Sequence, residues 1–153
     1  RLKTEILYEI FDNTIDIIYK YKPYISVHYR NTDMNNSINN FIKKIRKFSK
    51  IHKINNIFIA TDDYYAFERF EYFLPKLNFF KICSIPNCHG KNMHYHYNDK
   101  DSLIKNTLKD LYMIINSKYF IPSLNSGISK WLIHQKEDKD NALFDDEYDF
   151  TVL

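Results

Sequence analysis

Glycine and proline are scarce in this sequence, whose 153 residues include only two glycines and four prolines. That composition argues against a linker or a low-complexity segment. The glycine-rich phosphate motifs G-x-x-x-x-G-K-[ST] and G-x-G-x-x-G are absent as well. A nucleotide bound by this chain would therefore be held by means other than a glycine-rich loop.

Cysteine is scarce too, and long apolar runs are missing. Cys83 and Cys88 are the only cysteines, so no disulfide framework is expected. No run of about 18 apolar residues occurs, so the sequence predicts no membrane-spanning segment. Because the chain begins with Arg1 and not with Met, we expect a piece of a longer or processed protein, and the sequence indicates no compartment.

Charge is unevenly distributed along the chain. Residues 137–153 contain seven acids and one lysine, a net charge of −6, so the preceding 136 residues carry +9 of a chain whose total is +3. We expect one α/β domain over residues 1–136 and an acidic tail over 137–153. The basic body suits an anionic ligand, and a lysine-rich solvated surface is the alternative.

Apolar residues recur at helical spacing or in short β-rich runs along most of the chain. Helices are predicted over residues 4–21, 37–53, 64–73 and 101–116, with a last one ending near 135. Strands are predicted over 24–29, 56–62, 79–85 and 118–124, and 86–100 is a polar loop. The candidate helix caps are Ser37, Asp62 or Asp63, Asp101 or Ser102, and Asn125 with Ser126.

This alternation predicts an open parallel sheet with helices on both faces. Ligands of such sheets lie beyond the carboxyl ends of the strands. Polar residues follow three of the predicted strands at this point. They are His28, Arg30 and Asp33, then Thr61, Asp62 and Asp63, then Ser123, Asn125 and Ser126.

The segment ISVHYRNTD, residues 25–33, is a predicted strand that ends in an anion-binding pattern. His28 and Arg30 are two apart on an extended segment, so their side chains face the same side. Arg30 offers a rigid fork of donors suited to a diphosphate. Asp33 is placed to fix Arg30 or to accept hydrogen bonds from the loop backbone. On this spacing alone, a strand end with a surface Arg–Asp pair is an alternative.

Three blocks of the sequence resemble motifs of the α1,6-, α1,2- and protein O-fucosyltransferase superfamily. HYRNTD, residues 28–33, resembles the first donor-site motif, HVRRTD or HVRRGD. IFIATDD, residues 57–63, resembles a strand and acidic turn written ATDD or SDD. TLKDLYMIINSKYFIPSLNSGISKWL, residues 107–132, resembles the last block, which the α1,2 branch often writes DL-x-LMS-x-CKH-x-I-x-ANS-x-FSWW. The resemblance covers residues 24–134, in the family's order.

The resemblance implies the C-terminal lobe of a two-lobed GT-B glycosyltransferase, which binds GDP-fucose while an N-terminal lobe shapes the acceptor site. It implies that Arg30 holds the β-phosphate and stabilises the leaving GDP. His28 would lie against the guanosine or its phosphates, and Asp110 would accept hydrogen bonds from the guanine edge. The remaining implied donor-site residues are Asp62 and Asp63, and Leu124, Asn125 and Ser126 at a helix N-terminus that favours phosphate.

The reaction implied by the resemblance is transfer of fucose to a glycan or protein acceptor, with inversion and without a metal ion or other cofactor. Arg30 and the helix N-terminus at Ser126 would stabilise charge on the leaving diphosphate, and preorganised donors of this kind are commonly worth roughly 3–4 kcal/mol each. Asp33 or a residue of the other lobe would act as the base. No nucleic acid is implied as a partner.

The sequence departs from the family pattern at several positions. Asn31 stands in the place of the second arginine of HVRRTD, and Thr32 in the place of the glycine of HVRRGD. The α1,6 branch has a glutamate shortly after its motif, whereas the corresponding residues here, MNNSIN, contain no acid. The α1,6 assignment therefore does not follow, and the acceptor and the linkage are not indicated.

Other patterns have simpler explanations. The spacing of five potential zinc ligands fits no common zinc-site pattern, so a solvated loop is the favoured interpretation. These residues are Cys83, Cys88, His89, His94 and His96. Helix capping by Asp101 explains the D-x-D tripeptide at 99–101. The basic residues between positions 43 and 53 are expected to form a solvent-exposed helix face. Binding of nucleic acid or of an anionic membrane by this face is the alternative. Two rival functions stay open: a transferase of this fold with another nucleotide sugar, and a non-catalytic basic α/β binding domain.

Overall fold

The computed structural model describes residues 4–31, 36–85 and 99–136. Asp33, the histidines of the polar loop and the acidic tail lie outside these ranges. The helices are α1 (Thr4–Tyr21), α2 (Ile38–His52), α3 (Ala66–Phe73), α4 (Lys100–Ile115) and α5 (Gly127–Gln135). The strands are β1 (Ile25–Tyr29), β2 (Asn56–Thr61), β3 (Asn78–Phe80) and β4 (Tyr119–Ile121).

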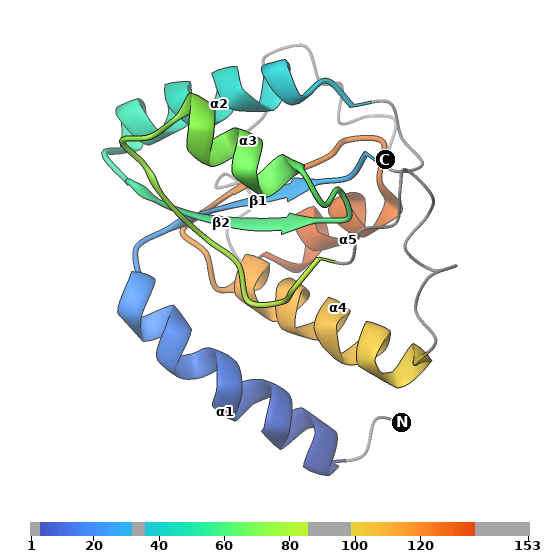
Figure 1. Ribbon diagram of the computed structural model, residues 1–153. Coiled ribbons are helices and arrows are strands. Elements are labelled where there is room, and N and C mark those ends of the chain that lie inside the picture. The colour runs from blue at the N-terminus through green and yellow to red at the C-terminus, as the bar shows by residue number, and fades with distance from the viewer. Residues whose placement is uncertain (1–3, 32–35, 86–98, 137–153) are drawn as a thin grey trace.

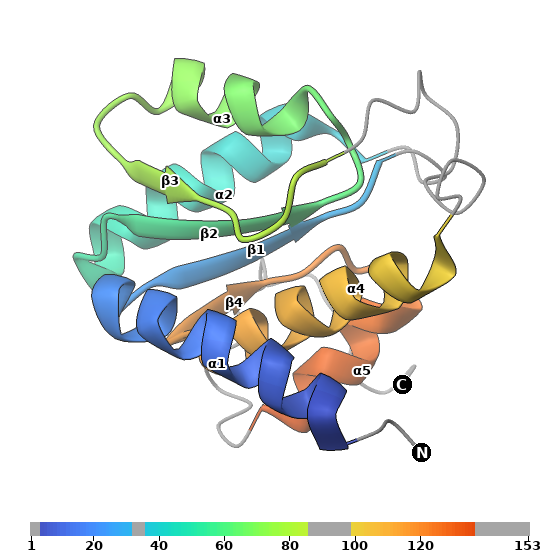
Figure 2. The same ribbon diagram turned by 60° about the horizontal axis from the view of Figure 1, so that its bottom comes forward.

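The four strands form one parallel sheet in the order β3-β2-β1-β4, so the central strand β1 lies between β2 and β4. Figure 1 shows α2 and α3 on one face of the sheet and α1, α4 and α5 on the other. Figure 2 shows the four strands between these two helical layers. The open parallel α/β sheet predicted from the sequence is confirmed. None of the described helices has both the length and the apolar run needed to cross a bilayer.

The side chains of β1 point alternately to the two faces of the sheet, which determines which of them lie on the α4 and α5 side. Ile25, Val27 and Tyr29 pack into the core beneath α2 and α3. The residues between them face the opposite layer, because successive side chains of a strand point to opposite faces. His28 accordingly bonds to a side chain of α5. The predicted common orientation of His28 and Arg30 is confirmed, since both line one cavity on the α4 and α5 side.

β2 is buried on both faces, as its apolar sequence predicts for a central parallel strand. Ile57 and Ile59 join the core under α2 and α3, while Phe58 and Ala60 join the core under α1, α4 and α5. The second core also contains Tyr24, whose hydroxyl donates to the carbonyl of Met113 at 2.6 Å. These two cores hold the strand ends of β1 and β2 at a fixed spacing.

Two strands are several residues shorter than predicted, whereas the bounds of β1 and β2 each differ by one residue. β4 ends at Ile121 because Pro122 has no N–H to continue the ladder with β1. β3 is an edge strand that pairs only with the first three residues of β2, and the chain leaves the sheet after Phe80. Both differences shorten the strands at their carboxyl ends.

The predicted helix caps were partly wrong. α3 begins at Ala66 and not at Tyr64, because Asp63 Oδ1 accepts a hydrogen bond from the N–H of Tyr65 at 3.0 Å in the turn that precedes the helix. Asp99, and not Asp101, caps α4 by accepting from the N–H groups of residues 101 and 102. Ser37 and Ser126 occupy the N-cap positions of α2 and α5, but neither side chain makes a capping hydrogen bond.

Candidate functional site

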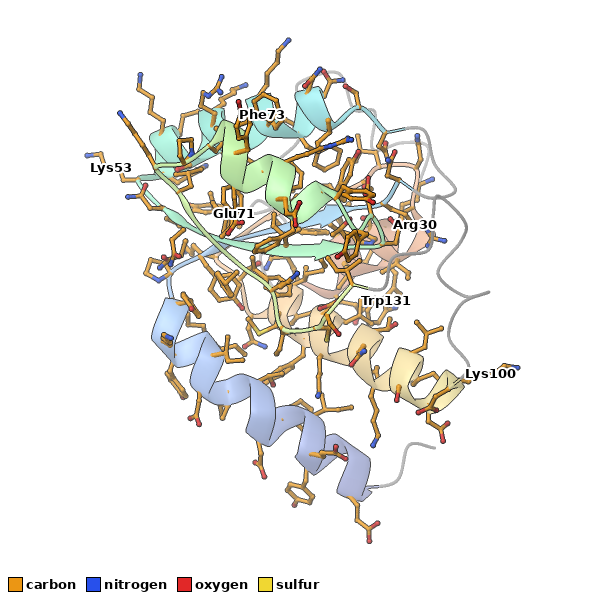
Figure 3. The ribbon with its side chains drawn as sticks, in the orientation of Figure 1. Arg30, Lys53, Glu71, Phe73, Lys100 and Trp131 are labelled. Carbon is orange, nitrogen blue, oxygen red and sulfur yellow. The ribbon has the colours of Figure 1, made fainter. Side chains whose placement is uncertain are left out.

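A cavity opens beyond the carboxyl ends of β1 and β2, where α4 and the first turn of α5 close its far wall. It measures about 650 Å³ counted out to the open solvent. Figure 3 shows Arg30 at this end of the sheet. We call this cavity the strand-end pocket, and its lining residues are His28, Arg30, Ala60, Thr61, Asp62, Thr107, Asp110, Leu111, Ile114 and Ile128.

Four of the predicted site residues meet in this pocket. His28 and Arg30 come from the end of β1, Asp62 follows β2, and Asp110 projects from α4. Asp63 lies beside the pocket in the turn before α3 and does not line it. The other predicted residues, Leu124, Asn125 and Ser126, lie between β4 and α5 and are not part of the pocket lining.

Arg30 is held in place by the acidic turn after β2. Its Nε lies 3.8 Å from Asp62 Oδ2, and both side chains are mostly buried. The other Asp62 oxygen accepts from the backbone N–H of Asn31 at 2.9 Å. The backbone N–H of Arg30 donates to Ser123 Oγ at 3.1 Å. The guanidinium is therefore oriented by Asp62, and the backbone at the end of β1 is held by Asp62 and Ser123, before any ligand is bound.

Asn31, which replaces the second arginine of the family motif, has a partner of its own. Its Nδ2 donates to Asp63 Oδ2 at 2.9 Å. Asp63 is further fixed because its backbone N–H donates to Thr61 Oγ1 at 3.1 Å. Asn31 and Asp63 thus tie the end of β1 to the end of β2.

His28 is electrically neutral near pH 7. Burial lowers its pKa to about 4, and the charge of Arg30 adds to this effect while that of Asp62 opposes it. Its Nδ1 lies 2.7 Å from Ser129 Oγ on the first turn of α5. The ring can therefore contribute a hydrogen bond to a ligand in the pocket but no net charge.

Asp110 faces the same cavity from the middle of α4. Burial raises its pKa to about 7, and among the described residues no cation lies within ion-pair distance of its carboxylate. A carboxylate in this position accepts hydrogen bonds and becomes easier to ionise when a ligand donates to it. Thr107 lies one helical turn before Asp110 and lines the same wall.

The N-terminus of α5 borders solvent at Asn125 and Gly127, which are exposed. Ser126 is fully buried, and its Oγ is the one buried side-chain atom without a hydrogen-bond partner in the part of the chain that the structure describes. The first N–H groups of a helix have no partner within the helix. A Cβ added at Gly127 would meet no atom within 4 Å, so there is space beside the first turn. These features favour an anion at this helix end.

Sequence reasoning missed two contributors to the site. Ser129 follows Ser126 by three residues, so helical spacing places it one turn later, on the side of His28. Thr107 precedes Asp110 by three residues, so the same spacing places it one turn earlier on the same wall. Helical periodicity was the available signal for both. In residues 4–31, 36–85 and 99–136, no three His, Cys, Asp or Glu side chains gather closely enough to hold a metal ion.

No family model matches this sequence, and no curated protein matches it either. Solved structures do match the fold. The NodZ α-1,6-fucosyltransferase soaked with GDP-fucose superposes with a TM-score of 0.60 at 16% identity, over 89% of this chain and 43% of that one. POFUT1 in complex with GDP-fucose gives a TM-score of 0.58 at 11% identity, over 86% of this chain and 43% of that one.

A further structure of POFUT1, in complex with GDP, gives a TM-score of 0.60 at 12% identity, over 89% of this chain and 46% of that one. Nearly the whole described fold is therefore shared with these proteins. The chain spans less than half the length of each of them. At such low identity the likeness concerns the fold alone.

Proposed function

From its fucosyltransferase-like fold and its strand-end pocket, we propose that this chain is the donor-binding part of a glycosyltransferase, and that it binds GDP-fucose. The whole enzyme would transfer fucose to a glycan or protein acceptor with inversion at the anomeric carbon. It would do so without a metal ion.

The observation that carries this proposal is the convergence of His28, Arg30, Asp62 and Asp110 on one pocket. These residues come from three segments that are distant in the sequence. They present a cation, a neutral ring and two carboxyl groups to the same space, one of which, Asp62, is paired with the cation. That set complements guanosine diphosphate, in which the base edge donates hydrogen bonds and the phosphates carry negative charge.

Each group then has a separate task in binding the donor. Arg30 would bind the β-phosphate, and the ion pair with Asp62 would keep the guanidinium in position. The N-terminus of α5, with the backbone of Leu124 and Asn125 and the hydroxyl of Ser126, would take the other phosphate oxygens. Asp110 would accept hydrogen bonds from the N–H groups of guanine. Asp63, beside the pocket, would order the turn or touch the nucleotide.

Transfer requires an acceptor hydroxyl to attack the anomeric carbon of fucose. The new C–O bond forms as the bond to the diphosphate breaks, and GDP leaves with the electron pair. Arg30 and the α5 N-terminus would stabilise the charge that develops on the diphosphate, which is the larger part of what this lobe can supply. The hydroxyl proton passes to a base, for which we propose Asp33 or a residue of the preceding lobe.

A second lobe must complete the reaction site. The matched solved chains are more than twice as long as the region that they share with this one. We propose that the chain binds the donor by itself and transfers the sugar only together with an N-terminal lobe that holds the acceptor.

A thermal-shift panel tests the proposal with GDP, UDP, CMP and GDP-fucose, each with and without EDTA. A ligand at 100 times its Kd stabilises the folded state by about 2.7 kcal/mol. We expect GDP and GDP-fucose to raise Tm, EDTA to have no effect, and Arg30→Ala to abolish the shift. Arg46→Ala is the matched control, because Arg46 is an exposed arginine on α2 that does not line the strand-end pocket.

Three outcomes would contradict parts of the proposal. A larger shift with UDP or CMP than with GDP would indicate another nucleotide sugar. Equal shifts in wild type and Arg30→Ala would place the nucleotide elsewhere. No response to any nucleotide, together with binding to DNA, would favour a non-catalytic basic domain.

A further inference from the structure

Ser129 connects the start of α5 to the motif at the end of β1. Its side chain is fully buried, and its Oγ lies 2.7 Å from Nδ1 of His28. The same oxygen accepts a hydrogen bond from the backbone N–H of Ser123 at 3.1 Å. Ser123 in turn donates through its own hydroxyl to the carbonyl of His28 at 2.7 Å. Two serines therefore fix both the backbone and the ring of His28.

The direction of the bond between Ser129 and His28 follows from the other partners of the serine hydroxyl. A hydroxyl has one hydrogen to donate. Thr14 and Thr107 donate theirs to the carbonyl four residues earlier in the same helix. Ser129 has no such bond among the described residues. Its hydrogen is thus available for Nδ1 of His28, which favours that nitrogen as the acceptor.

We propose that Ser129 is a positioning residue, which keeps the proton of His28 on Nε2 so that the ring offers a hydrogen-bond donor to the ligand in the strand-end pocket. Since the imidazole is neutral near pH 7, only one of its nitrogens carries a proton. Nδ1 is occupied as an acceptor, and Nε2 has no partner among the described residues. The ring lines the pocket, so Nε2–H is the group available there.

This inference predicts what His28 recognises. The ring would bind an acceptor atom, such as a phosphate oxygen or the carbonyl of a base, and would reject a donor. The consequence for binding rests on the proposed function, whereas the position of the proton does not. Together with the Asp110 carboxylate, which accepts, the pocket would present one donor and one acceptor that discriminate between nucleotides.

Nitrogen-15 NMR of the histidine rings tests the proton position directly in the wild-type protein. We expect the His28 signals of a neutral ring with the proton on Nε2. A ring protonated on Nδ1, or an even mixture of the two forms, would overturn the inference without any variant being made. His28→Gln assigns the signals, because it removes one histidine spin system from the spectrum.

Two variants test whether Ser129 is responsible. Ser129→Ala should shift the ring proton toward Nδ1 and weaken GDP binding about tenfold, and Ser129→Thr, which retains the hydroxyl, should restore both. Ser49→Ala is the matched control, since it removes a buried serine hydroxyl that donates to the carbonyl of Ile54 at 2.7 Å, outside the pocket lining. It should lower Tm without changing either readout.

The outcomes separate this inference from the proposed function. If wild type does not bind GDP but the ring proton is on Nε2 and moves in Ser129→Ala, the proposed function fails and the positioning role of Ser129 stands. If Ser129→Ala keeps the Nε2 proton and the affinity of wild type, the positioning role is wrong.

Discussion

Two openings that contain cationic side chains lie at opposite ends of the sheet. The strand-end pocket contains Arg30. The second opening, which we call the basic groove, lies between the carboxyl ends of α2 and α3 and is lined by Arg46, Ser49, Lys50, Lys53, Asn55, Phe73, Leu74, Pro75, Lys76 and Leu77. Figure 3 shows Arg30 and Lys53 at the two ends. The groove is the larger, at about 1050 Å³ counted out to the open solvent.

The two openings differ in what holds their charged groups. Arg30 is mostly buried and is fixed through an ion pair and backbone hydrogen bonds to two other segments. The four cations of the groove are exposed. Lys50 lies in the last turn of α2, and Lys53 follows that helix as its C-cap, where cations stabilise the helix dipole. Solvation and the interaction with the helix dipole are sufficient to account for these lysines, so their presence does not indicate a ligand.

This difference shows that size and charge alone do not indicate the site. A solvated lysine loses side-chain entropy when it binds an anion, whereas a preorganised guanidinium has already been ordered by folding. We therefore propose the smaller opening as the anion site.

After the loss of binding expected for Arg30→Ala, the largest expected effect is at Asp110, which has no counterpart in the basic groove. Asp110→Asn replaces an acceptor with an amide and should weaken GDP-fucose binding by about a hundredfold, since hydrogen bonds to charged groups contribute roughly 1.5–3 kcal/mol each. In wild type, the affinity should fall about tenfold from pH 8 to pH 6, because the carboxylate with a pKa of about 7 must ionise to accept. Titration calorimetry at the two pH values measures both effects.

GDP-fucose is the ligand for this experiment because its diphosphate diester does not titrate between pH 6 and pH 8. Asp110→Asn serves as its own control, since its affinity should be independent of pH over this range. A pH dependence that survives in the variant would show that another group is responsible.

The second prediction concerns stability, for which Asp110 and His28 have opposite effects. The folded-state pKa of Asp110, about 7, exceeds its ordinary value of 3.8, so the folded protein binds more protons and becomes less stable as the pH rises from about 4 to about 7. The folded-state pKa of His28, about 4, is below its ordinary 6.5, so stability increases as the pH rises over about 4 to 6.5.

Single variants separate these two contributions. Asp110→Asn should raise Tm at pH 7.5 by about 2–4 °C, the shift that 1 kcal/mol produces in a domain of this size. In the His28→Gln variant, the free energy of unfolding should fall more steeply between pH 4 and pH 7 than in wild type, because the opposing contribution of His28 has been removed. Thermal unfolding monitored by circular dichroism at several pH values measures both, and a lower Tm for Asp110→Asn at pH 7.5 would contradict the assigned cause.

A smaller effect is expected at Asn31, which ties the pocket edge together. Asn31→Ala removes the hydrogen bond to Asp63 and should cost about 1 kcal/mol of stability and about threefold in GDP affinity, because Arg30 is next in the chain. Asn78→Ala is the matched control. It removes a bond between two amides, Asn78 Nδ2 to Asn56 Oδ1 at 2.9 Å, at the amino ends of the strands. Equal losses of GDP affinity in the two variants would show that Asn31 has no specific role.

Local patterns in the sequence were sufficient to predict the sheet and the orientation of two side chains in the strand-end pocket. Strand alternation was sufficient to place His28 and Arg30 on one side, and the order of strands and helices was sufficient for the parallel sheet. Both are local regularities of the backbone. Pro122 was a readable signal that β4 ends at Ile121.

The contacts that build the strand-end pocket are different in kind. Ser129 meets His28 across about a hundred residues of sequence, and Asp62 meets Arg30 across about thirty. No local pattern encodes such pairs, because they depend on how helices and strands are packed. The prediction that Asp33 fixes Arg30 lies outside the described residues, whereas Asp62 is seen to do so.

The smallest effect is expected from substitutions in the basic groove. They test whether this groove contributes to donor binding. The triple variant Arg46→Gln, Lys50→Gln, Lys76→Gln removes three exposed charges. Charges separated by more than the Debye length, about 8 Å at physiological ionic strength, are largely screened, and the five residues of β1 alone span about 16 Å. GDP-fucose affinity should therefore stay within about twofold of wild type. Surface substitutions of this kind usually change stability by less than about 0.5 kcal/mol each. A loss of affinity greater than about fivefold, measured beside Arg30→Ala, would mean that the larger and more exposed opening takes part in donor binding.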